Sequence, residues 1–221
     1  VNGKGLQVIG TVTKTAVATG ADLVAYSGFS SSNYLQQPYN SDLDFGTGDF
    51  SAVVWLKSSV TGNSCILHRG SGGAGTWGDA IIQLEKNANN FSLVVSDDGF
   101  STATYVSVGA STITTGAWRM VSVVRRSGTF YMYVDGVQVG AATAGLNLTN
   151  TAAKLWVGER PNMTRPWDGS LALLRISATA PTAEQIAKIY RDEKPLFQEG
   201  AQATLYGTSD SVTALAYDDD T

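Results

Sequence analysis

Short stretches in which apolar residues alternate with polar ones recur along most of the chain, and this period of two predicts β-strands. Residues 50–57 (FSAVVWLK) are apolar on both alternating faces, as expected for a strand buried between two packed layers. The other segments with strand character are 80–86, 91–98, 118–128, 129–140, 154–160 and 169–177. Many short strands of this kind favour a β-sandwich over alternating strands and helices.

Turn-forming residues separate these segments, and one helix interrupts the pattern. Asp135-Gly136 lies between two β-rich runs and predicts a hairpin with a type I′ turn. Thr182 and Gln185 have the spacing of a helix-capping box, and apolar residues at helical spacing follow them until Pro195 ends the helix. We therefore predict an all-β fold, an antiparallel β-sandwich of the jelly-roll type with one short C-terminal helix.

The composition narrows the classes of partner. The 221 residues carry 15 basic and 19 acidic side chains, a net charge of −4, which leaves no broad basic surface for nucleic acid. No apolar run approaches the roughly 18 residues that cross a bilayer, so we expect no membrane insertion. Cys65 is the only cysteine and His68 the only histidine, which excludes an internal disulfide framework and a two-histidine metal site.

Catalytic motifs are not found in the sequence. A glycosidase needs two carboxyl groups that flank one bond, yet no glutamate has an acidic partner two positions away. Asp42 and Asp44 form such a pair, but their turn-forming neighbours place them at a loop edge. The chain also lacks the G-x-S-x-G elbow of a serine hydrolase. We expect no enzymatic activity, with a glycan-cleaving hydrolase that uses an unrecognised acid pair as an alternative.

Two loops, 68–79 and 158–169, combine aromatic, planar polar and glycine residues, the mixture with which proteins recognise sugar rings and hydroxyl groups. If the two loops meet, Trp77 and Trp167 are the predicted stacking platforms. The alternative is that each indole packs against the edge of the sandwich with an arginine stacked on it. The residues predicted to contact carbohydrate are His68, Arg69, Trp77, Asp79, Arg160, Arg165 and Trp167.

Calcium is the metal that these loops suit, because it prefers oxygen ligands from aspartate side chains and loop carbonyls. Asp79 with Asp168 is the predicted metal-ligand pair. No loop carries a dedicated calcium motif, so the sequence requires no cofactor.

Three segments and the helix that follows them occur in an order known from one family. The segments are 41–57 with an acidic-aromatic start and a tryptophan strand, 117–140 with the Tyr-Val-Asp-Gly hairpin, and 157–176 with a Val-Gly loop. In this order they resemble the concanavalin A-like, laminin-G-like jelly roll over roughly residues 42–191. The resemblance implies that loops at one end of the sandwich form a ligand or calcium site. The flanking segments 11–46 and 193–218 resemble segments of bacteriophage tail-fibre and virion proteins.

The predicted division of the chain is a strand and lead-in at 1–37, the jelly roll at 38–197, and the start of a following segment at 198–221. We predict a non-enzymatic phage tail or virion module that binds host-surface carbohydrate, located in the virion or otherwise outside the cell. The alternative is a purely structural domain that contacts neighbouring subunits. The resemblance implies other virion subunits as partners and a homotrimer as the assembly.

Overall fold

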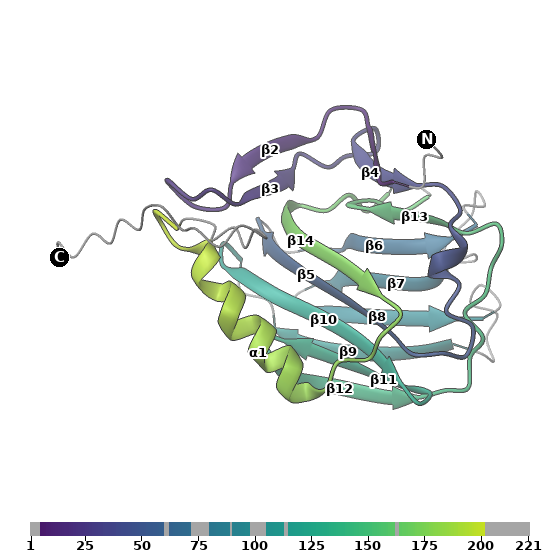
Figure 1. Ribbon diagram of the computed structural model, residues 1–221. Helices are drawn as coiled ribbons and strands as arrows, with labels where there is room; N and C mark the ends of the chain where they lie inside the picture. Colours follow the sequence, from purple (N-terminus) through teal and green to yellow (C-terminus); the bar gives the residue numbers. More distant parts are fainter. Residues whose placement is uncertain are drawn as a thin grey trace, which may run out of the picture.

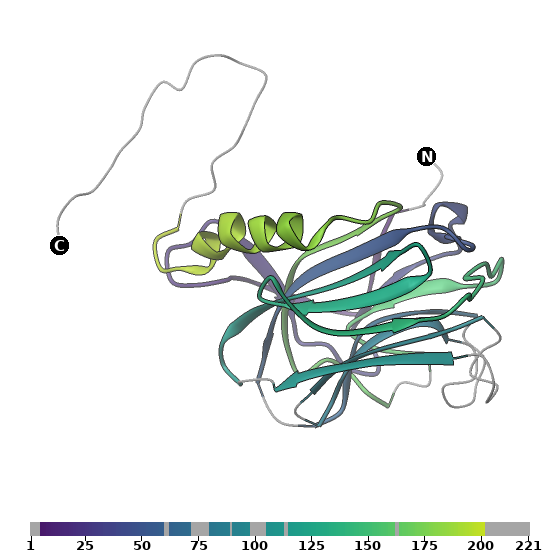
Figure 2. The same cartoon turned by 90° about the horizontal axis from the view of Figure 1, so that it is seen from below.

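Two antiparallel sheets of seven strands each pack face to face and form the body of the molecule (Figures 1 and 2). The structure is a computed structural model that describes residues 5–59, 62–71, 80–88, 90–97, 105–112, 115–161 and 164–201. The predicted all-β sandwich is therefore confirmed in these ranges. No helix among them is long and apolar enough to span a bilayer.

Each sheet combines strands from distant parts of the chain. Sheet A has the order β1 (Gln7–Ile9), β4 (Tyr34–Gln37), β13 (Lys154–Val157), β6 (Ser64–Gly70), β7 (Ala80–Asn87), β8 (Asn90–Ser96) and β9 (Tyr105–Thr112). Sheet B has the order β12 (Val137–Thr143), β11 (Thr129–Val134), β10 (Trp118–Arg126), β5 (Phe50–Ser58), β14 (Gly169–Ser177), β3 (Val24–Ser27) and β2 (Thr13–Ala16). The first 37 residues thus extend both sheets.

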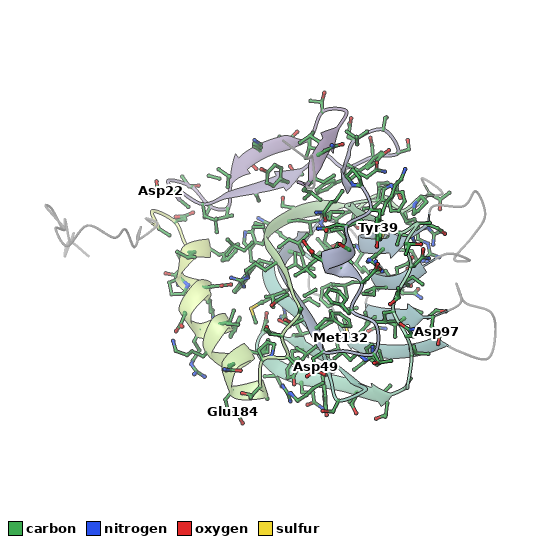
Figure 3. All side chains as sticks on the ribbon, turned by 45° about the vertical axis from the view of Figure 1, so that its right-hand side comes forward. Asp22, Tyr39, Asp49, Asp97, Met132 and Glu184 are labelled. Atoms are coloured by element: carbon green, nitrogen blue, oxygen red, sulfur yellow. The ribbon has the colours of Figure 1, made fainter. Side chains whose placement is uncertain are left out.

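The main core lies between the two sheets and follows the predicted alternation. Val54 and Leu56 of β5 meet Leu84 of β7 and Leu93 of β8 in one buried cluster. Met132 of β11, labelled in Figure 3, is fully buried in the same layer. Burying side chains of this size contributes about 1.5–3 kcal/mol each, so this layer supplies most of the stabilisation.

A smaller core lies on the outer face of sheet B, beneath the helix α1 (Ala183–Glu193). Trp55 stacks against Tyr190 of α1 at 5.7 Å and against Phe197 of the 3₁₀ helix η3 (Lys194–Phe197) at 4.2 Å between ring centroids. Figure 2 shows α1 outside the sandwich. The strand β5 is apolar on both faces because one face meets sheet A and the other meets this helix.

The two sharpest local predictions are confirmed. Asp135 and Gly136 connect β11 to β12 with φ angles of 50° and 81°, the left-handed pair that a type I′ turn requires. Thr182 and Gln185 form a reciprocal capping box at the start of α1. The turn and the helix also touch, because a Cβ on Gly136 would lie 3.0 Å from the Cα of Ala187.

Candidate functional site

The two loops predicted to bind carbohydrate leave the sheet in opposite directions. β6 and β13 are antiparallel neighbours in which Gly70 pairs with Lys154 and Leu67 pairs with Val157. The loop after β6 therefore starts at one end of this pair and the loop after β13 starts at the other. Trp77 and Asp79 lie outside the described residues, so stacking at Trp77 and the metal pair of Asp79 with Asp168 stay predictions.

Arg69 belongs to the inside of the sandwich. It is buried, forms an ion pair with Asp44 and donates a hydrogen bond to the carbonyl of Leu148 at 3.3 Å. Burial acts to raise the pKa of Asp44, but the N–H of Asn150, the Tyr39 hydroxyl and Arg69 together lower it below its ordinary value. In this conformation Arg69 fastens loops at one end of the sandwich, and a role in carbohydrate binding stays a prediction.

His68, the residue before Arg69 in β6, lies on the opposite, outer face of sheet A because neighbouring strand residues point to opposite sides. In the sheet it pairs with Trp156 of β13 and with Gln83 of β7. The rings of His68 and Trp156 meet edge to face at 5.7 Å. The imidazole Nδ1 lies 3.0 Å from the side-chain oxygen of Gln83. His68 therefore forms the middle of a polar row across three strands.

Glu85 and Arg165 extend this row, which we call the outer-face cluster (Trp156, His68, Gln83, Glu85 and Arg165). The Gln83 amide donates to Glu85 Oε2 at 2.8 Å, and Arg165 Nη1 donates to the same oxygen at 2.9 Å. The structure thus connects His68 with Arg165, two of the predicted residues, through two residues that were not predicted. The segment AIIQLEK contained the signal, because alternation places Gln83 and Glu85 on one face.

Polar side chains of the outer-face cluster are buried although they face away from the main core. Trp156, His68, Gln83 and Glu85 are each at most 4% exposed, whereas the side chain of Arg165 is 18% exposed. Burial raises the pKa of Glu85 above its ordinary value, against the opposing effects of Arg165 and Gln83. Arg165 is therefore the member through which solvent reaches the cluster.

The loop that carries Arg165 is closed on itself by Glu159 and is joined to β6 where the Arg165 carbonyl accepts the N–H of Cys65 at 2.8 Å. One carboxylate oxygen of Glu159 accepts the backbone N–H groups of Arg160 and Arg165, at 2.8 and 3.0 Å. Arg160 is buried and donates from Nη2 to the Thr164 hydroxyl at 2.9 Å. Burial raises the pKa of Glu159, and its two N–H donors oppose that rise. Arg160 and Arg165 are thus held close together at one rim of the cluster.

Several buried polar atoms at this site have no hydrogen-bond partner within the described chain. They are Nε1 of Trp156, Oε1 of Glu85 and Oε2 of Glu159. Glu85 and Glu159 both lie near Cys65, since both raise the pKa of that thiol, whose shift is dominated by burial. One donor and two acceptors are therefore left for a ligand or for water to satisfy.

Trp167 and Asp168 lie in the loop directly before β14, beside a hollow of about 360 Å³. Trp167 is 1% exposed and packs in the main core, and its Nε1 donates to the carbonyl of Ser170 at 3.4 Å. This conformation does not present the indole ring to solvent, so a stacking role stays a prediction. Asp168 forms an ion pair with Lys86. Among the described residues, no group of three or more metal-ligating side chains is present, and calcium binding stays a prediction.

The family model for the concanavalin A-like lectin/glucanases superfamily, of laminin G type, matches residues 29–187. The chain belongs to this superfamily. Its body of two antiparallel sheets is that of the concanavalin A-like fold. The resemblance in the sequence to this family is thus confirmed, and it covers the strands that carry the outer-face cluster. No curated protein sequence matches the chain.

Solved structures share this concanavalin A-like fold at low identity. The binding domain of Paraclostridial Mosquitocidal Protein 1 matches with a TM-score of 0.65 and 13% identity over 86% of this chain and 48% of its own. The receptor-binding domain of the botulinum neurotoxin C/D mosaic serotype matches at 0.64 and 14% over 86% and 46%. The binding domain of botulinum neurotoxin DC in complex with SialylT matches at 0.62 and 12% over 85% and 46%. The chain spans about half the length of these domains, and the likeness shows the fold.

Proposed function

We propose that this domain is a non-enzymatic module that binds carbohydrate on a cell surface through the outer-face cluster. The observation that carries the proposal is the set of unpaired buried atoms on Trp156, Glu85 and Glu159. A buried polar atom without a partner costs about 1–3 kcal/mol, and a bound ligand can recover that cost. A sugar hydroxyl donates and accepts at once, so neighbouring hydroxyl groups can serve both the indole N–H and the carboxylates. These atoms are closed to solvent in this conformation, so side chains at the rim, Arg165 first, have to move aside before a sugar reaches them.

The cluster also has the preorganisation that sugar recognition needs. Each planar polar side chain is held by its neighbour, from His68 through Gln83 to Glu85 and Arg165. A ligand then loses little affinity to ordering of these side chains on binding. The partly exposed Arg165 marks the side from which a glycan reaches the cluster.

Similar solved structures support the proposal that the domain binds a partner on a cell surface. One of the matched structures is a receptor-binding domain, a second is a binding domain in complex with SialylT, and a third is a binding domain in complex with rat synaptotagmin II. These domains are about twice as long as this chain. They make a cell-surface partner the first choice for a test.

The test is binding of the domain to a glycan array, with Trp156→Phe as the decisive variant. This change keeps an aromatic ring but removes the unpaired indole N–H, so we expect about tenfold weaker binding of the selected glycan. Trp118→Phe is the matched control, because Trp118 donates its N–H to the carbonyl of Val17 away from the cluster. Equal signals from all glycans, or equal loss in both variants, would contradict the proposal.

Glycan cleavage is the second candidate function. It is favoured by the presence of two buried glutamates, Glu85 and Glu159. A carboxyl group with a raised pKa is what a general acid requires, and both groups have one. Hydrolysis predicts release of reducing ends from the bound glycan, with loss of that activity in Glu85→Gln and Glu159→Gln. A binding module predicts no release by the native domain, and the same reducing-end assay distinguishes the two.

We further propose that the domain works in a phage tail or virion, as the flanking segments suggest, and as a homotrimer. The division into residues 1–37, 38–197 and 198–221 is part of the same proposal. If the domain has a purely structural role, it binds no glycan on the array but still forms the homotrimer. Sedimentation of the purified chain tests the trimer, and a monomer at micromolar concentration would contradict it.

A further inference from the structure

The hollow beside Trp167 is a separate place from the outer-face cluster. Glu85 and Lys86 are neighbours on β7 and point to opposite sides of sheet A, with Glu85 in the cluster and Lys86 bound to Asp168 at the hollow. The volume of about 360 Å³ falls within the range of about 300–1,000 Å³ that small-ligand sites occupy. The hollow lies at the end of the sandwich where β3 ends and β14 begins.

Asp168 is held in place before any ligand arrives. Lys86, which is 1% exposed, forms an ion pair with the Asp168 carboxylate and donates to the Ser58 hydroxyl at 2.7 Å. That hydroxyl in turn donates to Asp168 Oδ1 at 3.0 Å. The Lys86 ammonium also lies 5.4 Å from the centroid of the Trp167 ring. The carboxylate is therefore rigid, while 18% of its side chain remains exposed.

The charges around the hollow select against ions. Lys86 balances the charge of Asp168, so an anion or a metal ion gains little from this pair. The polar groups left to contact a ligand are hydroxyls, backbone and the edge of Asp168. The hollow is lined by Ser27, Ser59 and Ser170, by Asp168, by Gly28 and Gly169, and by the nearly buried aromatic residues Phe29 and Trp167.

We propose that this hollow is a subsite for one neutral pyranose unit of the glycan, an inference that rests on the proposed carbohydrate binding. The serine hydroxyls and the free edge of Asp168 hydrogen-bond the sugar hydroxyls. Phe29 and Trp167 are only 8% and 1% exposed, so hydrogen bonds rather than ring contact hold the sugar. Asp168 and Arg165 lie on one loop, so a longer glycan reaches both the hollow and the outer-face cluster around the rim of sheet A.

Two indole signals in one NMR spectrum report on the two places separately. The N–H of Trp167 donates to Ser170 at the hollow, and the N–H of Trp156 belongs to the outer-face cluster. Methyl glucoside, galactoside and mannoside are titrated into the native chain, with sialic acid as the charged comparison. We expect a saturable shift of the Trp167 signal with at least one neutral glycoside. The Trp156→Phe and Trp167→Phe variants assign these two signals among the five indole signals of the chain.

Ser59→Trp is the blocking variant, because Ser59 is exposed at the mouth of the hollow. Ser41→Trp is the matched control, an exposed serine in the 3₁₀ helix η1 (Ser41–Leu43) near Asp44 at the opposite end of the sandwich. We expect roughly tenfold weaker glycoside binding in Ser59→Trp and unchanged binding in Ser41→Trp. The NMR titration of the native chain keeps the inference testable even if a variant does not fold.

The outcomes separate this inference from the proposed function. A shift of Trp156 alone, or glycoside binding that survives Ser59→Trp, overturns the subsite and leaves carbohydrate binding in place. A Trp167 shift with sialic acid only overturns the neutral class of ligand. If no indole signal shifts with any sugar and the domain binds no glycan on the array, both proposals are overturned.

Discussion

Neighbouring residues on two strands of sheet A have different tasks because they face opposite sides. On β6, His68 joins the outer-face cluster while Arg69 pairs with Asp44 inside the sandwich. On β7, Glu85 faces the cluster while Lys86 holds Asp168 at the hollow. Loop composition alone predicts His68 and Arg69 at one site, although strand alternation already places two consecutive residues on opposite faces.

Acidification is expected to relieve a stability cost at Glu85 and Glu159, whereas at Asp44 it removes a stabilising contribution. Burial raises the folded-state pKa of Glu85 and Glu159 above the ordinary value of 4.5, so the folded chain takes up protons first as pH falls. The stability cost of these two ionised groups is present above the folded pKa and disappears as pH falls through it toward 4.5. Urea unfolding at pH 7 and pH 5 should therefore show a smaller gain on acidification in Glu85→Gln than in the native domain.

Asp44 supplies the matched comparison, since its folded-state pKa lies below the ordinary value of 3.8. Its stabilising contribution is present above 3.8 and is lost as pH falls through the lower, folded pKa. Asp44→Asn should leave the change between pH 7 and pH 5 as it is in the native domain. An identical pH response of the native domain and Glu85→Gln would contradict the assignment for Glu85.

The strands and the helix that have a clear apolar pattern or a capping motif could be predicted from the sequence. Strands that form only because they pair with a neighbouring strand could not. The apolar residues of β5 and the capping box of α1 predict these two elements, and both are present as expected. The sequence predicts one strand in the first 37 residues, but the structure has four there, β1 to β4. All residues of β2 are exposed, so no apolar alternation marks it, and its pairing with β3 defines it.

The cap of α1 should be measurable because the helix is short. Thr182→Ala removes the hydroxyl that accepts the N–H of Gln185, and loss of such a cap costs about 0.5–2 kcal/mol. Urea unfolding should show this decrease in the free energy of unfolding. Thr151→Ala, at an exposed threonine in a turn, is the control and should change stability by less than about 0.5 kcal/mol. Equal stability of both variants would show that the cap contributes nothing.

At the scale of the whole molecule, the candidate site depends on which strands become neighbours. His68, Arg160 and Arg165 were predicted from loop composition, but Trp156, Gln83 and Glu85 join them only through the register of β13, β6 and β7. Residues 83 and 156 are far apart in sequence, and no local pattern specifies that their strands flank β6. The family fold could be predicted from ordered motifs, whereas this gathering of polar residues could not.

The loops after β6 and β13 start at opposite ends of this strand pair, and this affects how the domain can evolve. Insertions or deletions in one loop leave the anchoring of the other untouched, because the rigid β6–β13 pair stands between them. Each end of the sandwich can thus acquire a new partner without redesign of the other end. A scaffold of this type is suited to diversification in which attachment at one pole is conserved while recognition at the other evolves.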